Sequence, residues 1–140
     1  MKILVRAVGR MRDRRLEELC GEYVDRARRH LPVTVDEVDD DGGLLRRLPA
    51  GTEIVALEPG GETWTTQALT DYLAERMNRG GKAVAFLIGG PDGLGRAVVA
   101  AAHRRLSLSA LTLPHRLARV ILCEQIYRAL SRIRGEPYDR

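Results

Sequence analysis

The sequence has only two cysteines among its 140 residues, and this scarcity limits the chemistry available to it. Cys20 and Cys123 show no CxxC spacing, and no cluster of histidines or cysteines surrounds either of them, so the usual zinc-site pattern is excluded. Both lie in segments with a helical pattern. We therefore expect two reduced core residues and no metal site.

A long uninterrupted apolar run is also missing near the amino terminus. Arg6 interrupts the run that starts at Ile3, well before it reaches the length of a signal-peptide core or a membrane span. We therefore expect a cytoplasmic protein that does not interact with membranes. No internal repeat or low-complexity linker divides the chain, and 44% of its residues are hydrophobic. We expect residues 1–140 to form one domain.

Positive charge is unevenly distributed. Residues 96–140 contain nine arginines and three acidic residues, whereas residues 36–41 are mostly acidic. Arginine binds phosphate groups bidentately, so this distribution indicates an RNA partner, although charge alone also suits a solvated helix face. A second group, called the arginine cluster below, follows the first predicted strand, and we expect it to contact RNA; it consists of Arg10, Arg12, Arg14 and Arg15.

Apolar periodicity predicts strands that alternate with helices. Short β-branched or apolar runs predict strands at residues 2–8, 33–38, 52–57 and 82–88, followed by a last apolar segment at 106–113. Three- and four-residue spacing, with caps and prolines at the ends, predicts helices at residues 12–30, 44–48, 65–79, 95–105 and 114–134. This order is typical of an α/β fold with a mainly parallel sheet and helices on both faces.

Three segments that follow strands are rich in glycine or small residues: 57–61, 89–94 and 108–114. The carboxyl ends of parallel strands share one edge of the sheet, so we expect the three segments to converge on a ligand site. The glycine pair at 89–90 would let a ligand approach the main chain, and a nucleoside-containing cofactor would fit. The dinucleotide and Walker patterns are not satisfied, and tight turns without a ligand remain an open interpretation.

Longer strings carry a resemblance to a known family: FLIGGPDGL at 86–94, LSLSALTLPH at 106–115 and EQIYRA at 124–129. In order and spacing they are similar to signature segments of the small SPOUT-class methyltransferases, which methylate N3 of a pseudouridine in 23S ribosomal RNA. The resemblance implies a SPOUT-type knotted fold with a C-terminal trefoil knot. It also implies S-adenosyl-L-methionine as cofactor, ribosomal RNA or the ribosome as partner, and a homodimer without metal.

The resemblance also assigns residues to a site. The cofactor-binding positions of the family match Leu57, Gly89, Leu108, Ser109, Ala110, Leu111, Thr112 and Leu113. The catalytic tail of the family matches Tyr138 and Arg140. A positive charge from Arg140 or Arg128 would favour the deprotonated, nucleophilic N3 of the substrate ring.

The tail also contains a departure from the family, because Asp139 stands where relatives usually have histidine. An acid beside substrate phosphate weakens RNA binding. Two alternatives therefore stay open. One is a SPOUT-like RNA-binding protein without methyl transfer, and the other is a methyltransferase that acts on a different RNA.

The last predicted helix is apolar on more than one face between Leu117 and Ile133, which is wider than a single core-facing stripe requires. We therefore expect a second copy of the chain to cover the extra face. Such a homodimer would complete the cofactor site of one chain with the tail of the other, as the composite sites of the family imply.

Four other residues have ordinary structural interpretations. Cys123 suits core packing better than nucleophilic catalysis, and Trp64 suits packing better than base stacking. Glu124 and Arg128 have the spacing of an ion pair within one helix. His115 suits either a backbone hydrogen bond at a helix start or a role in the site.

Overall fold

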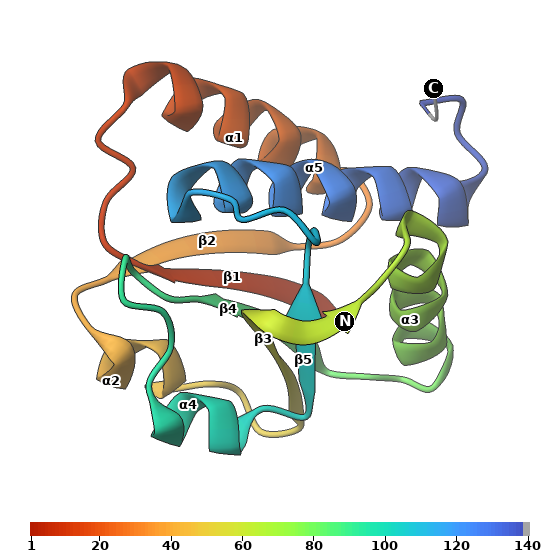
Figure 1. Ribbon diagram of the computed structural model, residues 1–140. Helices are drawn as coiled ribbons and strands as arrows, with labels where there is room; N and C mark the ends of the chain where they lie inside the picture. Colours follow the sequence, from red (N-terminus) through yellow and green to blue (C-terminus); the bar gives the residue numbers. More distant parts are fainter. Residues whose placement is uncertain (139–140) are drawn as a thin grey trace.

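The structure, a computed structural model, describes residues 1–138 and shows five strands and five helices in that range. Strands and helices alternate throughout this range (Figure 1). In chain order the elements are β1 (Lys2–Val8), α1 (Arg14–Ala27), β2 (Val33–Val38), α2 (Asp41–Leu45), β3 (Thr52–Thr63), α3 (Thr66–Asn78), β4 (Ala83–Ile88), α4 (Arg96–Ala101), β5 (Arg104–Ser107) and α5 (His115–Arg134).

The strands form one parallel sheet in the order β2-β1-β4-β3-β5. Strand β4 is central, and all six of its residues, Ala-Val-Ala-Phe-Leu-Ile, are buried. A parallel strand covered on both faces needs apolar residues at every position, which explains why this segment does not alternate with polar residues.

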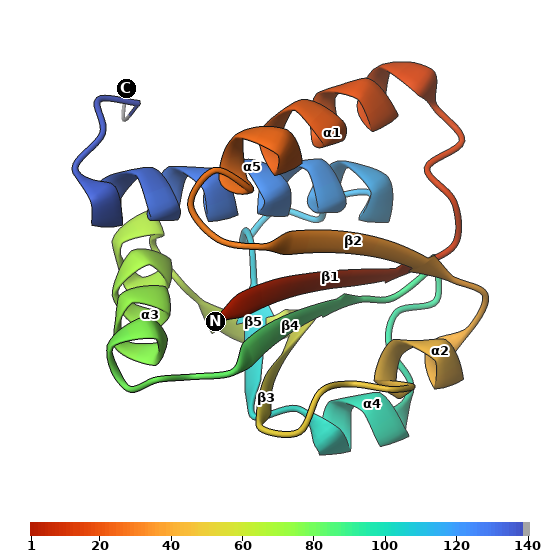
Figure 2. The ribbon, with the colours of Figure 1, turned by 180° about the vertical axis from the view of Figure 1, so that it is seen from behind.

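Helices cover both faces of the sheet, as the sequence predicts. Helices α1 and α5 lie side by side on one face, with α3 beside them, and α2 and α4 lie on the other (Figures 1 and 2). Successive strand residues point to opposite faces. Val84 and Phe86 therefore belong to the larger core under α1, α3 and α5, whereas Ala85 and Leu87 belong to the smaller core over α2 and α4.

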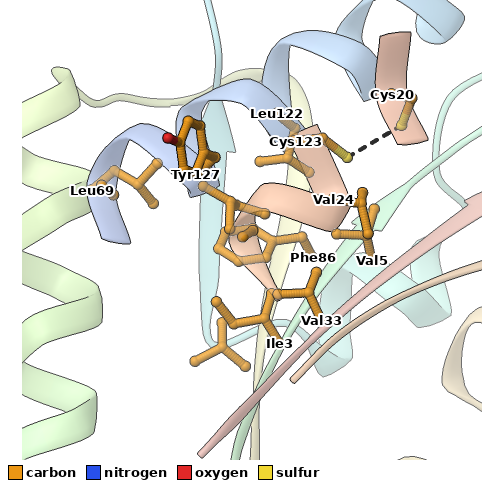
Figure 3. Close-up of a cluster of buried hydrophobic side chains, with 14 of the residues drawn as sticks. Ile3, Val5, Cys20, Val24, Val33, Leu69, Phe86, Leu122, Cys123 and Tyr127 are labelled. Carbon is orange, nitrogen blue, oxygen red and sulfur yellow. Dashed lines mark hydrogen bonds between the residues drawn. The ribbon is translucent and has the colours of Figure 1, made fainter. Parts of the chain in front are cut away.

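The two cysteines lie in the larger core. Cys20 on α1 and Cys123 on α5 are both buried free thiols, and their Sγ atoms are 3.4 Å apart (Figure 3). The predicted assignment of both as reduced core residues is confirmed. Their contact marks the line along which α1 and α5 pack.

Several predicted boundaries are wrong, among them both ends of the helix expected at 12–30, which is α1 at Arg14–Ala27. The helix expected at 44–48 is α2 at Asp41–Leu45, because the Asp40 carboxylate accepts a hydrogen bond from the Gly43 amide and starts the helix earlier. The helix expected to reach residue 105 ends at Ala101. His103 pairs with Ile54 through both its amide and its Nδ1 atom, so β5 begins at Arg104 on the edge of β3.

The predicted end of β3 is also wrong. The sequence predicts a strand that stops at Leu57, but β3 continues to Thr63 with residues 58–61 looped out between two residues that both face Leu106. Gly61 makes this possible. A Cβ atom there would lie 2.6 Å from the carbonyl carbon of Arg105, so only glycine lets the returning chain run this close to β5.

The predicted reason for a second copy at α5 is also contradicted. The wide apolar surface of α5 is covered within the chain, by α1, by α3 and by the sheet, and its buried residues include Val120, Leu122, Ile126 and Leu130. Leu117 is the large apolar side chain of this helix that is exposed, at 42%, and Leu19 on α1 is exposed to a similar degree, at 40%.

Candidate functional site

The sheet register brings the three predicted loop segments together. Leu57 of β3 lies directly beside Ile88 of β4 and beside Leu106 of β5. Gly89 follows Ile88 immediately, and Leu108 follows Leu106 by two residues. The expected cofactor-binding positions therefore converge at the carboxyl edge of three neighbouring parallel strands, where α/β proteins bind ligands.

The turn after β4 depends on Gly89 for its own geometry. A Cβ atom at Gly89 would lie 2.5 Å from the carbonyl carbon of Gly93 and 2.6 Å from its oxygen. The turn is closed by a 3.0 Å hydrogen bond from the Gly93 amide to the Gly90 oxygen, and Gly93 has a φ of 77°. Residue 89 must therefore be glycine because the backbone of Gly93 packs directly against it, whether or not a ligand also approaches it.

The loop after β5 is held by its own hydroxyl groups. Ser107 donates to the carbonyl oxygen of Ser109 at 2.9 Å, and the Ser109 hydroxyl accepts from the Leu111 amide at 2.9 Å. Such local bonds let a short loop keep one conformation without regular secondary structure. Leu111 is 76% exposed, so the loop presents an apolar side chain to whatever binds at this edge.

A pocket of about 200 Å³ adjoins this loop. Its walls come from the start of α3, from β5 and the following loop, and from α5; they are Trp64, Thr65, Thr66, Leu69, Leu106, Leu108, Ile121 and Gln125. A larger surface groove of about 380 Å³ lies along β2 and α2, among Arg6, Asp39 and Arg46. The residues that line that groove belong to β1, β2, α2 and the turns beside them, and not to the converging loops.

Tyr138 lies against its own helix α5. Its hydroxyl donates to Glu124 Oε2 at 2.9 Å, the same oxygen that accepts from Arg128 Nη2 at 2.7 Å, and its ring centroid lies 4.5 Å from that of Tyr127. Burial, together with the hydrogen bond to Glu124, raises the pKa of Tyr138 well above its ordinary value. The phenol therefore acts as a hydrogen-bond donor at neutral pH and not as a base.

The predicted ion pair on α5 and the predicted position of the tail have different outcomes. The predicted ion pair between Glu124 and Arg128 is present, and it fastens Tyr138 at the second half of α5. The contacts of Tyr138 that the structure describes lie on the α5 side of the molecule and do not reach the loops at 89–94 or 108–114. Arg140 and Asp139 lie outside the described residues.

The arginine cluster lies beside the turn after β4, since Ala7 at the end of β1 pairs with Ile88. Arg10 and Arg12 are exposed in the loop between β1 and α1, and the Arg14 and Arg15 side chains are both 91% exposed. Arg10 and Arg12 therefore present positive charge to solvent next to the candidate cofactor site, as an RNA-binding surface requires, whereas Arg14 pairs with Glu18 and Arg15 with Asp13.

Three of the residues with ordinary interpretations can now be assigned. Trp64 packs against Tyr72, with ring centroids 5.1 Å apart, and donates to Glu62, so it is a packing residue that also lines the pocket. Cys123 is part of the core. Burial and the nearby charges of Arg116 and Arg119 lower the pKa of His115, which makes it a neutral imidazole at the start of α5.

An ion pair between the buried Arg119 and the partly exposed Glu37, whose side chain is 39% exposed, is not predicted from the sequence. Arg119 is 2% exposed, and its Nη1 atom lies 2.6 Å from Glu37 Oε2. Burial raises the pKa of Glu37, but the hydrogen bonds from Arg119 and from the Met11 amide outweigh burial and lower it overall. A signal was present in the sequence, since Arg119 interrupts an apolar stretch of α5 on its buried side.

Within residues 1–138 no group of three or more histidine, cysteine, aspartate or glutamate side chains is arranged to hold a metal ion. None of the described helices has the length and apolar character needed to cross a bilayer.

Comparison with known proteins gives consistent matches along the whole chain. The sequence model of a family described as "Predicted SPOUT methyltransferase" matches residues 1–139. A protein of Sorangium cellulosum named ribosomal RNA large subunit methyltransferase H is 46% identical over 143 residues, which cover 99% of both chains. Proteins with the same name from Dinoroseobacter shibae and Rhodospirillum rubrum are 41% and 40% identical, and each match covers 100% of this chain and 99% of the relative.

Proposed function

Because this chain belongs to the SPOUT methyltransferase family, we propose that it uses S-adenosyl-L-methionine to methylate N3 of a pseudouridine in 23S ribosomal RNA. The observation that carries the proposal is the register of three strand ends, which brings Leu57, Gly89 and the loop at 108–113 to one edge of the sheet. Family membership also implies that α5 passes through a loop in a trefoil knot. The proposed substrate indicates a cytoplasmic enzyme.

The residues at this edge fit such a cofactor. The Gly89 turn and the loop at 108–113, which is held by its own hydrogen bonds, offer main-chain groups and small side chains to the cofactor. Leu57 offers it an apolar contact between the two segments. When bound, S-adenosyl-L-methionine supplies a methyl group activated by a sulfonium. The chain itself has to hold the acceptor nitrogen in line with that methyl group and to exclude water.

A positive charge near the acceptor ring would favour its deprotonated form. Arg128 is already paired with Glu124 in the described chain, so its charge is largely compensated. We therefore assign this role to Arg140, with Tyr138 as a hydrogen-bond donor to the substrate once the tail leaves α5. The arginine cluster would bind the surrounding phosphates.

We further propose a homodimer in which the tail of one chain completes the cofactor site of the other. Two observations support it. Tyr138 lies on the α5 side of its own chain, and Leu19 and Leu117 leave exposed apolar area along the layer formed by α1 and α5. A second copy of the chain would bury both leucines and bring its tail to the cofactor site, which the described contacts of Tyr138 within one chain do not reach.

A methyl-transfer assay tests the function directly. Ribosomes from cells that lack this protein are incubated with the protein and radiolabelled S-adenosyl-L-methionine, and the 23S RNA is digested and analysed by mass spectrometry. We expect one methyl group on N3 of a pseudouridine. A label on another RNA would support the alternative substrate. RNA binding without any label would support the RNA-binding protein, for which Asp139 in place of histidine is the observation in favour.

A further inference from the structure

The loop between β1 and α1 is held by side chains from distant elements. The Arg119 Nη2 atom donates to the Gly9 oxygen at 3.0 Å, and Arg116 Nε donates to the Arg10 oxygen at 3.1 Å. The Met11 amide donates to Glu37 Oε2 at 2.8 Å. Backbone groups of three consecutive residues are thus bonded by side chains of α5 and β2, although backbone groups of an exposed loop would ordinarily bond water.

Arg119 joins these bonds into one unit. It donates to Glu37 through Nη1 and to the loop through Nη2, and Glu37 in turn accepts from the loop. The planar guanidinium can span two acceptors at fixed angles, which the ammonium of lysine cannot do. Arg119 is buried, the Glu37 side chain is 39% exposed, and both bond to the loop, so this ion pair has the geometry needed to fix neighbouring backbone.

The loop needs such support because its conformation is unfavourable. Arg12 has a φ of 56°, a left-handed conformation that is costly for a residue with a side chain. Met11 between the two exposed arginines is buried, so Arg10 and Arg12 project from a loop whose residues 9–11 are all anchored. Without the anchors the loop would relax and its two arginines would lose their fixed directions.

We propose that Arg119, together with Glu37, is a positioning residue for RNA binding that sets the loop at 9–13 so that Arg10 and Arg12 face the substrate. The proposal rests on the proposed function, since it assigns RNA contact to the arginine cluster. Arg119 itself is too buried to touch RNA, and it acts through the loop.

The test measures binding of large ribosomal subunits from cells that lack this protein, and in parallel binding of S-adenosyl-L-methionine. Arg119→Met is expected to weaken subunit binding about tenfold, a loss comparable to that of one or two phosphate contacts, with cofactor affinity changed by less than about twofold. Arg79→Met is the matched control. It removes the same charge from an exposed position on the far end of α3 and is expected to leave subunit binding nearly unchanged.

A second background separates positioning from general destabilisation. In a variant with Arg10→Ala and Arg12→Ala, adding Arg119→Met should weaken subunit binding no further, because the arginines that it positions are already gone. Hydrogen exchange of the Met11 amide should be faster in Arg119→Met and also in Glu37→Gln. Glutamine has the same shape as glutamate but no charge, so Glu37→Gln provides the test if Arg119→Met does not fold.

The outcomes are distinct. Additive losses in the combined variant, or normal subunit binding by both Arg119→Met and Glu37→Gln, would overturn the positioning role while leaving the RNA surface in place. Normal binding by the Arg10→Ala and Arg12→Ala variant would show that these two arginines do not bind RNA, and it would overturn the positioning role. Methylation by the unmodified protein would then still establish the activity.

Discussion

Replacing Gly89 with alanine perturbs the candidate cofactor site at one defined contact. The added Cβ atom would meet the Gly93 carbonyl carbon at 2.5 Å, about 0.9 Å inside an ordinary van der Waals contact. Both partners belong to one tight turn, so the turn must open by roughly 1 Å. Overpacking of this size costs about 1–3 kcal/mol, and in a domain of this length each kcal/mol lowers the melting temperature by about 3–5 °C.

We therefore expect Gly89→Ala to melt about 3–15 °C lower and to bind S-adenosyl-L-methionine at least about tenfold more weakly, since a displaced turn no longer fits the ligand. Thermal unfolding and titration calorimetry measure the two effects. Gly90→Ala is the control, because its Cβ would make only ordinary contacts with the Val8 side chain, at 3.4 Å from Cγ1 and 3.8 Å from Cβ, so its melting temperature should stay within a few degrees. Equal losses of stability in both variants would refute the steric argument. Normal cofactor binding by Gly89→Ala would show that the cofactor site does not include the Gly89 turn.

Neutralising all four residues of the arginine cluster should weaken RNA binding and flatten its dependence on salt, because fewer counterions are released; an unaltered salt slope in filter binding would mean that the cluster only faces solvent. Mixing a cofactor-deficient Gly89→Leu chain with a chain that lacks residues 138–140 should restore methyl transfer through mixed dimers, and inactive heterodimers confirmed by native mass spectrometry would rule out composite sites. The depressed pKa of Glu37 means that its ion pair stabilises the fold above the ordinary glutamate pKa of 4.5 and that this contribution disappears as the pH falls through the lower folded value. The difference in melting temperature between the unmodified protein and Glu37→Gln should accordingly shrink in acid, and a constant difference from pH 7 to pH 3 would contradict the assignment.

The sheet shows which parts of the fold local sequence determines. Strands β1 and β2 match their predicted ranges, and β4 differs by one residue, because each is a short run of apolar or alternating residues between clear turn signals. Strand β5, with the sequence Arg-Arg-Leu-Ser, has no such pattern. It is a strand because it pairs with β3 on both sides of the looped-out residues 58–61, and these partners lie more than forty residues away.

The candidate site divides in the same way. The strand ends and their glycines follow from the order of predicted elements, so the convergence of the three loops could be predicted. The ion pair between Arg119 and Glu37 could not be predicted, because the two residues are 82 positions apart and the sequence around each gives no sign of the other. The prediction that a second copy covers the apolar surface of α5 is wrong for a similar reason. The pattern of a helix shows how much apolar surface it has, but not which element packs against that surface.

The packing of α1 against α5 also has a consequence for synthesis. Roughly ninety residues separate the two helices, and a ribosome that adds about 5–20 residues per second needs roughly 5–18 s to make them. During that time Cys20, Val24 and Ala27 on α1 have no α5 to bury them. The larger core closes only when α5 emerges from the ribosome, so the apolar face of α1 stays exposed until synthesis is almost finished. A chain truncated before α5 is expected to be captured by chaperones or to aggregate rather than fold.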